Sequence, residues 1–328
     1  MWQHFEIRGT GSYLPGTGVS AAEIEERARL PAGWIAQHTQ VELRYECARP
    51  ETLATMARHA MQRAMDDANV TWKEIDLLID CSTSRHQPIP CNGAILQSLF
   101  LPESDGVPVM DIHGTCLGFM LALNVVNALF STGMYQRILL VVSESTLAAA
   151  NWNEPESSTL LSDGAAALVL QKREPTPNFY FQHETYSKHL DECQVMGGGH
   201  SLPAFEFSSD KNDAYRFHME GPRLFRTALR RLPPLVEQLL DESQIPRDSI
   251  LFVPHQASPH AVEAVRRRLK VSSDRFINRA AVLGNMASAS IPVVVDQLRR
   301  NSQLSIGQPV MFLGTSAGFS QAGLLFTP

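Results

Sequence analysis

Residues 108–133 read PVMDIHGTCLGFMLALNVVNALFSTG, and this stretch decides the fold class. The short apolar run at its start predicts a buried strand, and the long apolar run after Cys116 predicts a buried helix. Glycines bound the turn between them. A buried strand that leads through a tight turn into a buried helix is typical of a layered α/β protein.

The same alternation continues on both sides of this stretch. Apolar runs bounded by turn residues predict strands within residues 4–15, 75–84, 137–145, 163–172, 250–256 and 308–318. Helical spacing of apolar residues predicts helices within residues 20–30, 51–68, 221–243, 260–270 and 291–301. Helices that alternate with buried strands favour an α/β fold with stacked layers.

The chain divides into two halves of similar content. We place them at residues 1–174 and 175–328, because a polar, proline-containing segment at 171–180 separates the two series of strands and helices. In the second half, residues 197–213 read GGGHSLPAFEFSSDKND and predict a long loop. Long loops often border functional sites.

Composition excludes several classes of protein. The chain has 328 residues, of which 44% are hydrophobic and 19% charged, as in ordinary soluble globular proteins. Its formal net charge of -6 argues against broad nucleic-acid binding, which needs a basic surface. No apolar run reaches the roughly 18 residues of a membrane span, and the first residues lack the pattern of a secretory signal. We therefore expect a cytoplasmic protein.

The five cysteines are scattered, and none forms a pattern typical of disulfide frameworks or zinc sites. Four of them read as small buried side chains. Cys116 differs because it lies in a turn before a helix, where free backbone amides and the helix dipole favour the thiolate. The same amides could stabilise the oxyanion of a thioester intermediate. Taken alone, this position fits a structural cysteine equally well.

Two further residues occupy similar positions. His255 follows the apolar strand of VPHQAS, and Asn285 follows a glycine in LGNMASASIP, just before a helix. A single histidine after a strand is more often structural, and a Gly-Asn pair is usually a turn. The edge of the sheet at which strands lead into helices is, however, where α/β folds gather catalytic groups. Cys116, His255 and Asn285 are therefore candidates for one site.

The order of these motifs resembles the 3-oxoacyl-acyl-carrier-protein synthase III (ketoacyl synthase III) branch of the thiolase superfamily. The resemblance rests on the strand-Cys-helix unit, then PHQA, then GN-x-x-x-A-S-I-P. Further similar stretches are ETLATMA, IDLLIDCSTS, SDGAAALVL, HMEGPRLF and GTSAGFSQAGLL, so the resemblance covers nearly the whole chain. It implies a five-layered α/β/α/β/α fold made of two similar halves, and a homodimer.

The resemblance also implies roles for individual residues. Cys116 would carry the acyl group, and His255 and Asn285 would donate hydrogen bonds to the thioester carbonyl of a malonyl substrate. The backbone amide of Cys116 and the amides of the loop at residues 316–318 would form the oxyanion hole. The oxyanion hole and the acyl and pantetheine pocket would then include Ser316, Ala317, Gly318, Phe319, Phe119, Ile89 and Trp34. The substrates would be coenzyme A or phosphopantetheine thioesters, with no metal or organic cofactor.

The stretch WIAQHTQV departs from the family pattern. Trp34 is kept, but His38 stands where acetyl-coenzyme A-dependent members have an arginine, Gln40 replaces a glycine, and no matching arginine occurs within residues 151–159. Neutral drift would explain this. Equally, coenzyme A could be held differently, or the acyl donor could be attached to a carrier protein.

Other departures concern the carrier protein and the acyl chain. His260 stands where the family often has an arginine that contacts the carrier protein, and the basic residues of the next helix could still attract an acidic partner; these are Arg266, Arg267 and Arg268. A solvated helix face would look the same. Ile89 stands where short-chain enzymes place a phenylalanine that closes the acyl tunnel, so a medium or long chain could fit.

We therefore predict an acyltransferase that joins an acyl thioester to a malonyl thioester by decarboxylative Claisen condensation, in fatty acid or specialised metabolism. Asn285 favours this reaction because a neutral amide stabilises an enolate without acting as a base. The main alternative is a synthase III-like acyltransferase that moves the acyl group to another carbon, oxygen or nitrogen nucleophile. A non-catalytic subunit would not need Cys116, His255 and Asn285 intact, and a papain-like hydrolase would need a different cysteine motif.

Overall fold

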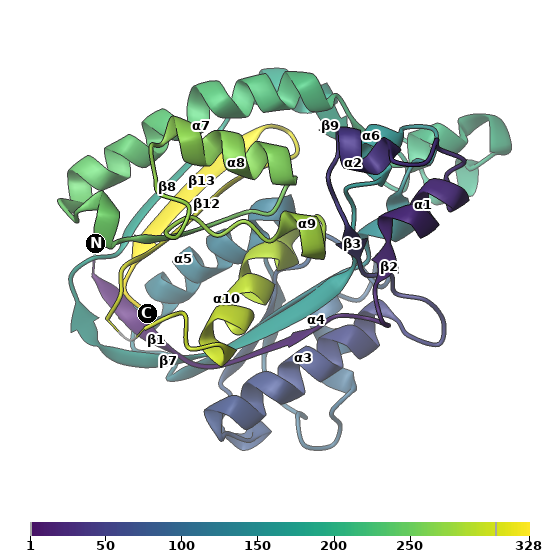
Figure 1. Ribbon diagram of the computed structural model, residues 1–328. Helices are drawn as coiled ribbons and strands as arrows, with labels where there is room; N and C mark the ends of the chain where they lie inside the picture. The colour runs from purple at the N-terminus through teal and green to yellow at the C-terminus, as the bar shows by residue number, and fades with distance from the viewer. Residues whose placement is uncertain (1, 306) are drawn as a thin grey trace.

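The computed structural model describes residues 2–305 and 307–328, and it contains two main β-sheets (Figure 1). The first sheet has five strands, in which β4 pairs in parallel with β5 and β6, and β7 pairs antiparallel with β6 and β1. Its order is β1 (Gln3–Tyr13), β7 (Gly164–Thr176), β6 (Arg137–Glu144), β4 (Leu77–Asp80) and β5 (Val109–Asp111).

The second sheet has four strands, all from the later part of the chain. Its first two strands pair in parallel, and the third and fourth strands are each antiparallel to the strand before them. The order is β11 (Leu251–Pro254), β12 (Val310–Ser316), β13 (Ser320–Phe326) and β8 (Tyr180–Thr185). Cys116 follows the parallel strand β5 and His255 follows the parallel strand β11, whereas Asn285 lies in the loop before a helix.

Helices fill three layers around these sheets (Figure 1). Two apolar helices, α5 (Gly118–Ser131) and α10 (Ser290–Arg300), share one buried core with residues of both sheets. The outer face of the first sheet packs against α3 (Leu53–Ala68) and α4 (Asn92–Ser98). The outer face of the second packs against α7 (Gly221–Ser243) and α8 (Pro259–Arg268). The predicted five-layered α/β/α/β/α fold is confirmed.

Strand β12 shows how the sequence produces this layering. Val310 and Phe312 contact the central core, whereas Met311 and Leu313 contact the core under α7 and α8. Alternate side chains of a strand point to opposite faces of its sheet, so a continuous apolar run is buried on both sides.

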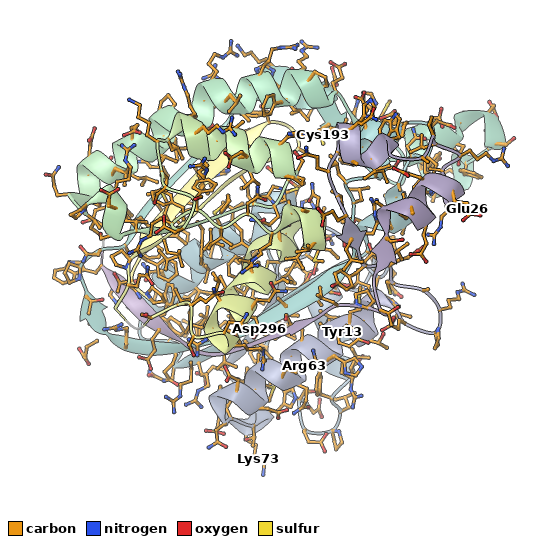
Figure 2. All side chains as sticks on the ribbon, viewed as in Figure 1. Tyr13, Glu26, Arg63, Lys73, Cys193 and Asp296 are labelled. Carbon is orange, nitrogen blue, oxygen red and sulfur yellow. The ribbon has the colours of Figure 1, made fainter. Side chains whose placement is uncertain are left out.

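A polar cluster ties the N-terminal strand to the central helix. The buried carboxylate of Asp296, on α10, accepts hydrogen bonds from Thr10 Oγ1 at 2.7 Å and Ser12 Oγ at 2.6 Å. Nearby, the guanidinium of Arg63 on α3 lies 5.4 Å from the centroid of the Tyr13 ring (Figure 2). The two hydrogen bonds to Asp296 hold α10 against β1, and the N-terminal end of α10 follows the loop that carries Asn285.

Shorter elements gather at one end of the molecule (Figure 1). They include β2 (Val19–Ser20), α1 (Ala21–Arg27), α2 (Trp34–His38), β3 (Leu43–Arg44), α6 (Pro155–Ser158), β9 (Cys193–Gln194), β10 (His218–Met219) and α9 (Ala280–Leu283). Ser20 caps the N-terminus of α1, because its side chain accepts a hydrogen bond from the amide of Glu23. The predicted loop at 197–213 contains only two short 3-10 turns, η5 (Ala204–Glu206) and η6 (Ser209–Tyr215).

The strands and longer helices predicted from the sequence all form. Strand β8 and the short helices α2, α4, α6 and α9 were not predicted. The helices have seven residues or fewer, which is too short for a clear periodic pattern. The first sheet uses strands between residues 3 and 176 and the second uses strands between 180 and 326. The proposed boundary between residues 174 and 175 falls inside β7, two residues before that strand ends at Thr176. In the described ranges, every helix is too short or too polar to cross a membrane.

Candidate active site

Cys116 lies in a single 3-10 turn, η2 (Thr115–Leu117), between β5 and α5. Thr115 has a φ of +47°, so the chain turns sharply just before the cysteine. The backbone amide of Phe119, in the first turn of α5, donates to Ser288 Oγ at 2.9 Å. Ser288 belongs to η8 (Ala287–Ala289), which follows Asn285, so this bond joins the cysteine segment to the asparagine segment.

His255 follows β11 and is only 6% exposed. Its backbone amide donates to the carbonyl of Leu313 on β12 at 2.8 Å. A Cβ atom at Gly314 would lie 2.7 Å from the Cβ of His255 and 3.6 Å from Leu117 Cδ2. The residue after Cys116 and the histidine therefore approach each other across Gly314, where only glycine leaves enough room.

Asn285 is held by its backbone and by its side chain. Its amide donates to the carbonyl of Leu160 at 2.7 Å, and its carbonyl accepts from Ser162 at 3.0 Å. The side-chain oxygen Oδ1 accepts from the backbone amide of Ala287 at 2.9 Å. Because Oδ1 is engaged in this way, the side-chain orientation is fixed and Nδ2 is the atom left to donate.

The proposed oxyanion loop, Ser316, Ala317 and Gly318, connects β12 to β13. Gly318 has a φ of +79°, which favours glycine at this turn. Phe319 and Phe119 are 0% and 1% exposed. The Phe119 ring lies beside the core residue Phe312, and the Phe319 ring lies beside Tyr186 and His189. Both phenylalanines therefore support the site from the core.

Other predicted site residues lie away from this junction. Ile89 is 83% exposed on the loop between β4 and α4, so the single chain does not bury it in an acyl pocket. Trp34 lies on α2, and its ring stacks on His38 with 4.1 Å between centroids and 8° between planes. On α8, Arg266 and Arg267 each form an ion pair with Glu263. The side chains of Arg268 and His260, on the same helix, are exposed.

Two family models match the chain. Residues 110–188 match the model of 3-oxoacyl-(acyl-carrier-protein) synthase III, and residues 240–327 match the model of its C-terminal part. Together they cover just over half of the chain, and they include all three candidate catalytic residues. The chain belongs to the 3-oxoacyl-acyl-carrier-protein synthase III-like family of the thiolase superfamily.

Relatives and solved structures agree with this family over the full length. The beta-ketoacyl-(acyl-carrier-protein) synthase III of Neisseria gonorrhoeae is 28% identical over 325 residues, 98% of this chain and 99% of that protein. The corresponding protein of Vesicomyosocius okutanii is 29% identical, with 97% of each chain covered. The structure of the priming beta-ketosynthase of the R1128 polyketide pathway has a TM-score of 0.89 at 26% identity, covering 100% of this chain and 97% of its own.

The ionisation of Cys116 in this synthase III-like protein differs from the sequence prediction. Burial raises the pKa of the Cys116 thiol, and the neighbouring Cys193 and Glu144 raise it further. The expectation that the helix dipole would favour thiolate was therefore wrong. A helix N-terminus contributes at most about 2 kcal/mol, whereas removing water from a buried charge changes a pKa by several units. Cys116 rests as a thiol, and it must lose its proton as it attacks.

Burial has the opposite effect on the histidine of this synthase III-like site. It lowers the pKa of His255 to about 4, so the imidazole is neutral at physiological pH. Its Nδ1 atom is buried and has no hydrogen-bond partner among the described residues. A neutral imidazole donates from one nitrogen only, which suits a hydrogen bond to a thioester oxygen.

The buried histidine predicts a pH-dependent stability. An unfolded histidine has a pKa near 6.5 and the folded His255 a pKa of about 4, so the unfolded chain binds more protons between these values. Stability therefore falls as the pH drops below 6.5. We expect the wild type to lose about 2 kcal/mol more than His255→Gln between pH 7 and pH 5, measured by urea unfolding. Parallel losses in the two proteins would contradict the assignment.

Two residues near the nucleophile were not singled out from the sequence. Cys193 is 8% exposed on β9 (Figure 2), and it was grouped with the structural cysteines. Glu144 is fully buried at the end of β6, where burial raises its pKa to about 7 and the amides of Thr83 and Ser84 donate to it at 2.7 and 2.9 Å. An acidic residue that ends an apolar strand was a readable signal for Glu144. No local pattern marks Cys193.

Proposed function

We propose that this chain catalyses the decarboxylative Claisen condensation of an acyl thioester with a malonyl thioester, with Cys116, His255 and Asn285 as the catalytic residues. The observation that carries the proposal is the meeting of three segments. The amide of Phe119 donates to Ser288 Oγ and so joins the cysteine segment to the asparagine segment. Gly314 lies between the side chains of Leu117 and His255, so the histidine segment also meets the cysteine segment. Its relatives are named as enzymes of this reaction class, synthase III.

In the first half-reaction, the sulfur of Cys116 attacks the carbonyl carbon of the acyl thioester and loses its proton. The tetrahedral oxyanion that forms accepts hydrogen bonds from backbone amides of the Cys116 turn and of the 316–318 loop. The carbon–sulfur bond of the substrate then breaks. The free thiol leaves, carrying the proton, and the acyl group remains on Cys116.

In the second half-reaction, the malonyl thioester enters and its carboxylate leaves as carbon dioxide. The electron pair of the broken carbon–carbon bond moves into an enolate, whose oxygen accepts hydrogen bonds from the neutral His255 and from Asn285 Nδ2. The enolate carbon attacks the acyl-Cys116 carbonyl. The 3-oxoacyl thioester is released, and the Cys116 thiolate takes up a proton.

The side chains of Cys116, His255 and Asn285 support a reaction that needs thioester substrates and no further reactive group. A thiol nucleophile and two neutral hydrogen-bond donors supply every group that the two steps need, so we propose no metal or organic cofactor. The location in the cytoplasm remains the prediction made from the sequence.

We propose a homodimer, supported by the exposed apolar loop around Ile89. That side chain is 83% exposed between two prolines, Pro88 and Pro90. A second copy of the chain would cover this loop, and Ile89 could then line the partner's acyl pocket, leaving room for a medium or long chain. Light scattering that gave the mass of one chain would contradict the dimer.

We propose that the carrier protein contacts the exposed side of α8. Arg267 has a side chain that is 74% exposed although it pairs with Glu263, and Arg268 and His260 are exposed as well. Basic groups of this kind raise association rates with acidic partners. In the double variant Arg267→Glu, Arg268→Glu, the KM for malonyl-carrier protein should rise while the rate with malonyl-pantetheine stays unchanged.

The function is tested by following the acyl group and the carbon dioxide together. The purified chain is incubated with acyl-coenzyme A of graded chain length, and its intact mass is measured before and after malonyl-carrier protein is added. An acyl adduct that disappears with an equal release of carbon dioxide supports condensation, and the preferred donor gives the chain length. An adduct that malonyl cannot remove would favour the alternative acyltransferase.

A further inference from the structure

The loop that carries Asn285 is held at both of its ends. It begins after α9, passes through Gly284 and Asn285, and continues into η8 and α10. The bond from the amide of Phe119 to Ser288 Oγ holds the later end. At the earlier end, Gly284 has a φ of +67°, so the backbone turns sharply just before the asparagine. The position of the Asn285 side chain therefore depends on what this turn packs against.

Ser162, which is fully buried, lies directly against this turn. Its backbone amide donates to the carbonyl of Asn285 at 3.0 Å, and the residue before it, Leu161, forms a parallel β-bridge with Asn285. A Cβ atom at Gly284 would lie 2.6 Å from the Cβ of Ser162 and 3.4 Å from its Oγ. The side chain of Ser162 therefore packs against the backbone immediately before the catalytic asparagine.

Two further segments of the chain hold Ser162 from other sides. Its Oγ accepts from the backbone amide of Tyr45, just after β3, at 2.9 Å. The amide of Asp163 donates back to the carbonyl of Tyr45 at 2.8 Å. Thr146 Oγ1 donates to the carbonyl of Ser162 at 2.8 Å. Ser162 is thus bonded to three segments that are distant in sequence, and this leaves it little freedom to move.

The contacts of Ser162 belong to a closed ring of elements. Helix α9 lies against β3 (Figure 1), and the amide of Glu42 donates to the carbonyl of Ala281 on α9 at 2.7 Å. From α9 the chain reaches Asn285, which is bonded to Ser162, and Ser162 is bonded back to Tyr45 beside β3. Among these bonds, the one from Tyr45 to Ser162 Oγ uses a side chain. It is therefore the bond of the ring that a substitution can remove.

The Nδ2 atom of Asn285 is sensitive to the position of this backbone. Its Oδ1 accepts from the amide of Ala287 at 2.9 Å, so the side chain moves together with the loop instead of adjusting independently. A misplacement of about 1 Å can slow an enzyme roughly 10²-fold even when it originates away from the reacting atoms. A residue that fixes the loop therefore affects the step in which Asn285 donates.

We propose that Ser162 is a positioning residue for Asn285. Its side chain, packed against Gly284 and bonded to the amide of Tyr45, sets where Asn285 Nδ2 lies relative to the enolate oxygen. The inference rests on the proposed function, because Asn285 donates in the decarboxylation step of that reaction. Ser162 itself touches no substrate, and it acts on the reaction through Asn285.

The first test measures the loop without catalysis, by hydrogen exchange of the backbone amides of residues 284–287 in the full chain. Ser162→Ala removes only the hydroxyl, and we expect these amides to exchange about tenfold faster than in the wild type, because the loop opens more easily. Ser143→Ala is the matched control, since Ser143 is equally buried on β6 and its Oγ donates to the carbonyl of Leu53 at 2.8 Å. It should leave these amides unchanged. Unchanged exchange in Ser162→Ala overturns the proposal.

The second test compares the two half-reactions. In Ser162→Ala, the kcat for decarboxylation of malonyl-carrier protein should fall about tenfold with its KM within about twofold, and acylation of Cys116 should stay within about twofold of the wild type. When Asn285 is already alanine, adding Ser162→Ala should change decarboxylation less than about twofold, because the residue it positions is gone.

Three results of this comparison overturn the proposal: a wild-type kcat in Ser162→Ala, equal losses in both half-reactions, or a full tenfold loss in the Asn285→Ala background. A wild type that cannot decarboxylate malonyl-carrier protein would instead contradict the proposed function. The exchange of residues 284–287 would then still decide whether Ser162 positions Asn285.

Discussion

Replacing Cys116 with alanine should abolish the acyl adduct and reduce condensation by on the order of 10⁶-fold, as removal of the nucleophile does in other enzymes with covalent intermediates. The reason is chemical: alanine has no atom that can hold the acyl group, and the remaining donors can only orient substrates. Intact mass after incubation with acyl-coenzyme A should show an acyl-sized gain in the wild type and none in Cys116→Ala.

Cys193→Ala is the matched control for this prediction. Cys193 is buried near the nucleophile and raises its pKa, but it lies on β9 and not at the start of a helix. The control should still acquire one acyl group, because the pKa of Cys193 is raised to about 12 and its neutral thiol places no charge beside Cys116 at neutral pH. An acyl adduct that persisted in Cys116→Ala and vanished in Cys193→Ala would assign the nucleophile to the wrong cysteine.

The resting thiol also affects how the first half-reaction depends on pH. Because the pKa of Cys116 is raised above its usual range, the thiolate is scarce at neutral pH. The intrinsic rate of attack should therefore increase with pH across the neutral range.

The fold was predictable because its signals are local. The apolar run from 117 to 130 specifies a buried helix, and β12 with its alternating contacts specifies a strand covered on both faces. The order of Cys116, His255 and Asn285 was also readable, because each follows a strand or loop and precedes a helix. Such patterns need no knowledge of tertiary neighbours.

The properties that were missed all depend on neighbours distant in sequence. The ionisation of Cys116 depends on burial and on Cys193 and Glu144, which no spacing rule connects to it.

Changing Asn285 to aspartate should separate the two half-reactions. The substitution keeps the size of the side chain, and the remaining oxygen can still accept from the amide of Ala287, which Oδ1 accepts at 2.9 Å in the wild type. It removes the Nδ2 donor and adds a negative charge where the enolate oxygen develops. Loss of one such donor costs roughly 10²- to 10³-fold in other enzymes, and the added charge should increase the effect.

We therefore expect Asn285→Asp to affect the acylation rate and the decarboxylation rate differently. Acylation of Cys116, followed by intact mass, should remain within a few-fold of the wild type, because the first step uses the backbone amides around Cys116 and residues 316–318. Release of carbon dioxide from malonyl-carrier protein should fall by about 10³-fold. Acyl-Cys116 should accumulate as a result.

Asn301→Asp is the matched control, since it makes the same chemical change at the exposed end of α10, far along the helix from Asn285. It should decarboxylate malonyl-carrier protein at the wild-type rate. If Asn285→Asp also kept that rate, the enolate would have to be stabilised by other donors. His255 alone would then remain as a side-chain donor to the thioester oxygen, and the neutral amide at position 285 would have only the structural role that its bond to Ala287 already gives it.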